Sequence, residues 1–127
     1  MQSVRVEAHG IGGNDLYRFD GMDIELTRGD SLQFKVTIQG RELPAGTEAL
    51  FTVKRSPTAE ETMIEKRLAV DEDGVVYVGI GNEDSDIPSR TYFWDLRVLI
   101  PLGDGSFEVR TPMEYAAFTI LEVIGDV

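Results

Sequence analysis

Hydrophobic and polar residues alternate along most of the chain with a period of two. Residues 31–38 show this without error, since all four even positions are apolar and all four odd positions are polar. Successive side chains of a β-strand point to opposite faces of a sheet, so this alternation is typical of a strand with one buried face. In residues 91–100, every second residue from Tyr92 to Ile100 is likewise apolar or aromatic. Both segments are predicted to be half-buried antiparallel strands.

Shorter segments of the same period predict further strands at residues 4–6, 23–27, 49–54, 64–70, 76–80, 106–111 and 116–124. Turn-forming residues separate them, as in Arg28-Gly29-Asp30 and in Asp71-Glu72-Asp73-Gly74, where glycine accepts a positive φ. Only residues 58–63 have helical character, with Thr58 as N-cap, and six residues form one turn at most. Eight or nine short strands with turns between them are typical of an antiparallel sandwich or barrel.

The chain is long enough for one hydrophobic core. It has 127 residues and a mass of 14.1 kDa, which leaves little room for two cores. Residues 1–22 are less regular than the rest, so we interpret them as an N-terminal arm or lead-in and residues 23–127 as the domain. The first six residues lack the apolar core of a signal peptide, and the apolar runs are too short for a membrane helix.

Charge narrows the range of partners. Twelve basic and 23 acidic residues give a net charge of −11, which argues against binding to nucleic-acid backbones and to anionic membranes. The acidic residues concentrate at 71–73 and 83–86. We interpret these clusters as solubilising; docking to a basic partner and binding of a hard cation are the alternatives.

We single out no catalytic, cofactor-binding or metal-ligating residue. His9 is the only histidine and cysteine is absent, which disfavours a Ser-His-Asp triad, thiol chemistry and a zinc site. The Asp71-Glu72-Asp73-Gly74 segment fails the EF-hand pattern, since its glycine is fourth and position twelve is Asn82. Gly10-Ile11-Gly12-Gly13 lacks the Lys-Ser/Thr of a phosphate-binding loop. We expect no cofactor and no enzymatic activity; an enzyme with a carboxylate pair is the lesser alternative.

Three features have both a structural and a functional interpretation. The Arg28-Gly29-Asp30 tripeptide matches the motif of integrin ligands, but its position between two alternating segments favours a turn. Tyr92 and Trp94 suit a carbohydrate-stacking platform if exposed, yet their place on the most apolar strand favours the core. Tyr92 begins that strand shortly after Pro88, as a tyrosine corner does, with its hydroxyl bonded to the upstream backbone.

Four segments in order carry a resemblance to a known family: residues 26–36, the Phe-Thr-Val-Lys segment at 51–54, residues 87–97, and Thr111-Pro112 with residues 117–120. Together they resemble small bacteriophage and prophage structural domains, notably the N-terminal domain of siphophage baseplate upper proteins. The resemblance covers residues 23–124. It departs from the family at Ala116-Ala117, where glycine is usual, and no fibre region follows, so we expect a free-standing version of the module.

The resemblance implies an all-β, Ig-like antiparallel β-sandwich of about eight strands. It implies a virion structural or assembly protein of a tail, baseplate or neck, without catalytic residues. Its partners would be other phage structural proteins, with self-association into a homo-oligomer as an option. It would reside in the virion, or in the host bacterial cytoplasm during assembly. The alternative is a carbohydrate-binding or adhesive β-sandwich module.

Overall fold

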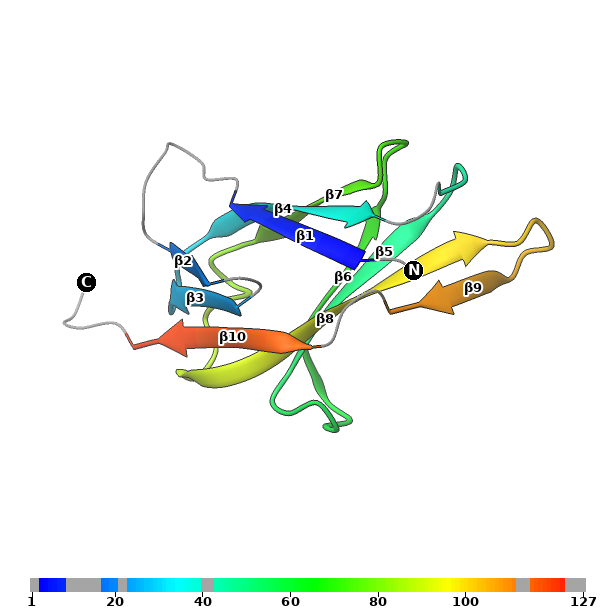
Figure 1. Ribbon diagram of the computed structural model, residues 1–127. Helices are drawn as coiled ribbons and strands as arrows, with labels where there is room; N and C mark the ends of the chain where they lie inside the picture. The colour runs from blue at the N-terminus through cyan, green and yellow to red at the C-terminus, as the bar shows by residue number, and fades with distance from the viewer. Residues whose placement is uncertain (1–2, 9–16, 21–22, 40–42, 112–114, 123–127) are drawn as a thin grey trace.

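The computed structural model describes residues 3–8, 17–20, 23–39, 43–111 and 115–122. Every regular element in these ranges is a β-strand, as the alternation predicts (Figure 1). The same ranges contain no helix, and therefore none long and apolar enough to span a membrane. The strands are β1 (Ser3–Ala8), β2 (Tyr17–Asp20), β3 (Asp23–Thr27), β4 (Leu32–Gln39), β5 (Glu48–Lys54), β6 (Thr62–Ala69), β7 (Val75–Ile80), β8 (Arg90–Pro101), β9 (Phe107–Arg110) and β10 (Ala116–Leu121).

The strands form two sheets. The smaller has the order β1-β4-β7; the larger has the order β2-β3-β10-β8-β5-β6, with β9 paired to β8 beside β10. All pairs are antiparallel except β3–β10, which is parallel from Ile24 opposite Phe118 to Thr27 opposite Leu121. The prediction of a purely antiparallel arrangement is wrong at this pair. These strands lie far apart in the sequence, so no hairpin forces them to run in opposite directions.

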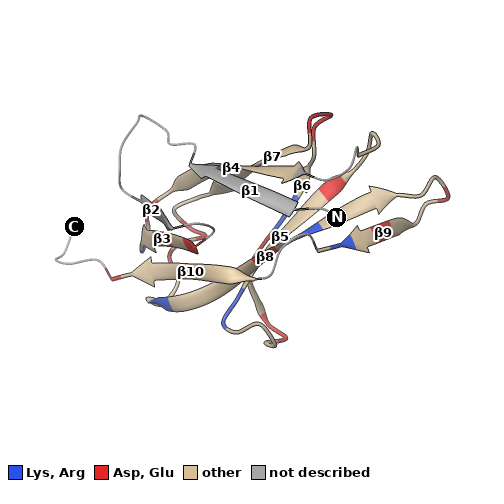
Figure 2. Ribbon diagram, viewed as in Figure 1, with Lys and Arg blue, Asp and Glu red and all other residues tan. Residues whose placement is uncertain are grey.

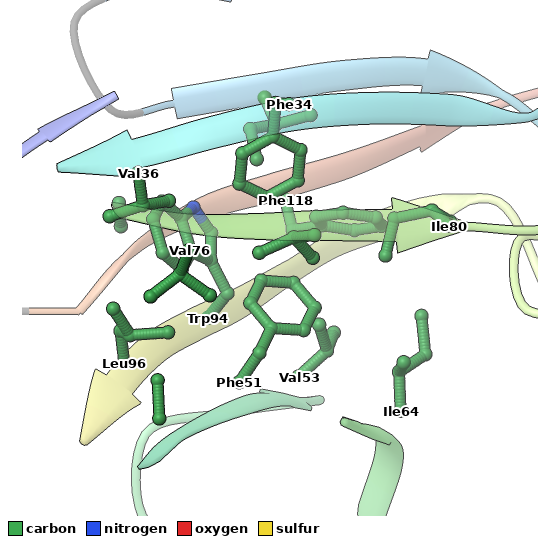
Figure 3. Packing of buried hydrophobic residues seen from close by; sticks show 14 of the residues in the cluster. Phe34, Val36, Phe51, Val53, Ile64, Val76, Ile80, Trp94, Leu96 and Phe118 are labelled. Carbon is green, nitrogen blue, oxygen red and sulfur yellow. The ribbon is translucent and has the colours of Figure 1, made fainter. Parts of the chain in front are cut away.

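One hydrophobic core lies between the two sheets (Figure 3). Phe34 of β4 packs against the larger sheet, with its ring centroid 5.9 Å from that of Phe51 in β5 and 6.0 Å from that of Trp94 in β8. Both contacts are edge-to-face, the geometry that aromatic quadrupoles prefer. The apolar residues at the even positions of 31–38 and 91–100 are all buried in this core, which confirms the two strongest strand predictions.

Two strands, β1 and β2, lie within residues 1–22, the segment interpreted as an arm or lead-in. β1 lies within the lead-in and pairs with β4, which confirms the strand predicted around residues 4–6, and β2 pairs with β3. His9 and the glycines at 10–13 lie outside the described residues.

Residues 58–63, the segment with helical character in the sequence, form no helix, so Thr58 is not an N-cap. The N–H of Ala59 donates to the carbonyl of Ser56 in a turn. Thr62 already begins β6, where pairing with β5 satisfies the backbone.

The turn of the β6–β7 hairpin requires glycine at its last position, Gly74. Gly74 has a φ of +79°, and its carbonyl accepts a hydrogen bond from the N–H of Ile38 at 2.8 Å. A Cβ built on Gly74 would lie 2.7 Å from the carbonyl oxygen of Ile38. Oδ1 of Asp71 accepts from the N–H groups of Asp73 and Val75, both at 2.9 Å. The hairpin predicted at residues 71–74 is confirmed.

Gly74→Ala is expected to reduce the free energy of unfolding by about 1–3 kcal/mol more than Gly105→Ala does. Gly105 is a matched control because its φ is +91° but no atom lies near its Cβ position. Both variants meet the cost of a positive φ, and only Gly74→Ala adds the steric contact with Ile38. Urea unfolding measures the difference; equal effects would contradict the described hairpin packing.

Candidate functional site

Tyr92 and Trp94 are core residues. Their exposed fractions are 0% and 1%, which confirms the core interpretation and excludes these two side chains as a stacking platform for a sugar. The hydroxyl of Tyr92 donates to the carbonyl of Pro88, four residues upstream, at 2.6 Å. The predicted tyrosine corner is therefore present, and it fixes the chain where it enters β8.

The Arg28-Gly29-Asp30 segment is a turn, as favoured by its position, with a φ of +85° at Gly29. The loop after β7 holds it in place. Nε of Arg28 lies 3.0 Å from Oδ1 of Asp86, and the hydroxyl of the fully buried Ser85 donates to the carbonyl of Asp30 at 2.5 Å. The guanidinium of the tripeptide is thus already paired within the chain.

The acidic clusters lie in turns, including the turn between β6 and β7 that Figure 2 shows in red. Within the described residues, no three His, Asp or Glu side chains are grouped so that they could hold a metal ion. In the second cluster, Oδ2 of Asp84 accepts from the N–H of Gly81 at 2.8 Å and lies 2.8 Å from Nζ of Lys66. Lys66 belongs to the larger sheet and Asp84 follows β7 of the smaller sheet, so this ion pair ties the two sheets together.

The pKa of Asp84 reflects this environment. Burial of the carboxyl favours its neutral form, but the hydrogen bonds from Lys66 and Gly81 and the charge of Lys66 outweigh it, and the pKa lies below the usual value. In the sequence, Lys66 interrupts the apolar face formed by Ile64, Leu68 and Val70, and the alternation alone does not predict its partner. A lysine at an inward position is itself the signal, because such a charge needs an opposite charge nearby.

Asp84→Asn is expected to make the free energy of unfolding less dependent on pH in the acidic range. A depressed pKa in the folded state stabilises the fold above the unfolded pKa of about 3.9, and this contribution is lost as the pH falls through the folded pKa. Between neutral pH and about pH 3 the variant should therefore lose less unfolding free energy than the wild type. Asp73→Asn at the exposed hairpin is the matched control. Wild-type-like acid sensitivity in Asp84→Asn would contradict this role for the Lys66–Asp84 pair.

A depression of about 200 Å³ lies on the outer face of the larger sheet, over β5, β6 and β8. We call it the outer-face depression; its lining includes Thr52, Lys54, Glu65, Phe93, Asp95 and Tyr115. The rings of Phe93 and Tyr115 meet edge-to-face with centroids 5.5 Å apart. Oδ1 of Asp95, opposite Thr52 in the sheet, is buried and has no hydrogen-bond partner among the described residues. Alternation places these side chains on the outer face, but only the register brings them together.

The hairpin formed by β8, β9 and the turn between them carries a group of exposed apolar side chains. The exposed fractions are 57% for Leu102, 39% for Phe107 and 55% for Val109. In the described part of the chain, β9 pairs only with β8, so no described strand covers its other edge. We call this the β9 edge.

Comparison with known proteins adds no assignment. No protein-family model matches the chain, and no curated protein matches it.

Proposed function

We propose that the chain is a structural domain of a bacteriophage or prophage particle, in its tail, baseplate or neck. In this proposal it binds neighbouring structural proteins, catalyses no reaction, and resides in the virion or in the host bacterial cytoplasm during assembly. The proposed fold is an Ig-like β-sandwich. The resemblance of residues 23–124 to phage structural domains supports a place in a phage particle. The exposed apolar side chains of the β9 edge support binding to neighbouring proteins.

Two observations support the Ig-like sandwich. The shared core lies between two sheets, with Phe34 of one sheet against Phe51 and Trp94 of the other. The hydrogen bond from Tyr92 to Pro88 is a tyrosine corner, a recurrent feature of immunoglobulin-type sandwiches where a strand crosses from one end of the core.

The β9 edge is the observation that carries the proposed function. Natural sheets usually protect their edges with charges that point inward and with bulges. The β6 edge has both devices, with Lys66 directed toward Asp84 and a register shift next to Lys54. β9 presents the exposed side chains of Phe107 and Val109, which alternate with the ion-paired charges of Glu108 and Arg110. Such an edge suits the addition of a strand from another subunit, with apolar contacts beside it.

The carbohydrate-binding or adhesive alternative has no observation in its favour. Burial of Tyr92 and Trp94 removes the aromatic platform on which it depended. The turn at residues 28–30 does not present a free guanidinium, because Arg28 is paired with Asp86.

The genes that flank the coding sequence give the first test of the setting. The proposal expects tail, capsid or terminase genes beside it. A neighbourhood made up of metabolic genes would contradict the proposal. Proteins encoded beside it can then be co-expressed with the chain, and size-exclusion chromatography shows which of them elutes with it.

Val109→Lys is expected to abolish this co-elution while leaving the chain folded, because a charge on the β9 edge opposes strand addition. Leu121→Lys is the matched control, since Leu121 has an exposed fraction of 41% and lies on β10, away from the β9 edge. Co-elution that survives Val109→Lys, or that is lost equally in both variants, would contradict docking at this edge.

A further inference from the structure

We propose that the outer-face depression binds a basic side chain, arginine or lysine, of a neighbouring protein, and that Asp95 is its anchor. This inference rests on the proposed function in one respect: the basic side chain belongs to an assembly partner. The binding chemistry itself follows from the depression alone.

The unpaired carboxylate oxygen of Asp95 calls for a hydrogen-bond donor. Oδ1 is buried although Asp95 lies on the outer face of β8, and no donor among the described residues reaches it. Lys54 and Arg97 also line the depression, but neither donates to this oxygen. A buried acceptor without a partner is costly, so a ligand that brings a donor gains affinity by satisfying it.

The walls of the depression suit a cation on an apolar stem. Phe93 and Tyr115 present aromatic rings beside Asp95, and ring faces attract ammonium and guanidinium groups. Glu65 adds a second carboxylate. The volume of about 200 Å³ is below the roughly 300–1,000 Å³ of pockets for whole small molecules and matches the scale of a single inserted side chain.

Other ligands fit these residues less well. An anion offers no donor to Oδ1 of Asp95, so it would leave this oxygen unsatisfied. A purely apolar side chain would leave Oδ1 of Asp95 unsatisfied. The net charge of −11 also attracts basic partners over a distance.

Amide chemical shifts of the isotope-labelled full chain test the inference. The probes are the Nα-acetyl N-methylamides of arginine, lysine and norleucine; norleucine supplies a stem of similar length without charge. We expect saturable shifts at Thr52, Phe93 and Asp95 with the arginine or lysine probe and none with norleucine. Absence of shifts with both basic probes, or equal shifts with norleucine, would overturn the inference.

Asp95→Asn is expected to weaken binding of the basic probes by about tenfold or more, since a charge-assisted hydrogen bond is lost. Asp73→Asn removes the same charge at the exposed hairpin and should leave the affinity unchanged. The melting temperature of Asp95→Asn should equal or exceed that of Asp73→Asn, because Oδ1 of Asp95 has no hydrogen-bond partner among the described residues. Unchanged affinity, or a clearly lower melting temperature, would show that Asp95 is not an open anchor.

The assembly role and the binding site for a basic side chain can be rejected independently of each other. Val109→Lys leaves the outer-face depression intact, so it should bind the basic probes as the wild type does. Probe binding without co-elution of neighbouring gene products would reject the assembly role and retain the site. Co-elution without probe binding would reject the site and retain the assembly role.

Discussion

Packing of Phe34 against Phe51 and Trp94 is the contact on which the architecture depends. Phe34 comes from the smaller sheet and the other two residues come from the larger sheet, so these aromatic rings connect the two sheets through the shared core (Figure 3). Each such pair contributes about 0.5–1.5 kcal/mol beyond the burial of its apolar area. With these rings inside, every odd residue of β8 points outward, and the outer face becomes available for binding.

The β6 edge and the β9 edge of the larger sheet differ in how well they are protected against the addition of another strand. Near β6, the Lys66–Asp84 pair joins the sheets and places a charge where another strand would otherwise add. At the far side, the hairpin of β8 and β9 exposes Leu102, Phe107 and Val109. In the proposed assembly role, protection at one edge and exposure at another would give the subunit directional contacts, since contact at every edge would lead to uncontrolled aggregation.

The alternation of apolar and polar residues predicted the features that residues close together in the sequence determine. The strands at residues 31–38 and 91–100, the hairpin at 71–74 and the corner made by Tyr92 all follow from spacing within a few residues. The parallel β3–β10 pair joins segments over ninety residues apart, and no local pattern encodes its direction. The outer-face depression was missed for the same reason: Thr52, Glu65 and Asp95 come from three strands, and only the register sets them side by side.

Proton–proton nuclear Overhauser contacts between the ring of Phe34 and the rings of Phe51 and Trp94 test the central claim most directly. Centroid distances of 5.9 and 6.0 Å in edge-to-face geometry place ring protons in contact, so the shared core predicts cross-peaks for both pairs. A folded chain in which Phe34 shows contacts only to residues of its own sheet would contradict the core shared by the two sheets and the outer face that depends on it.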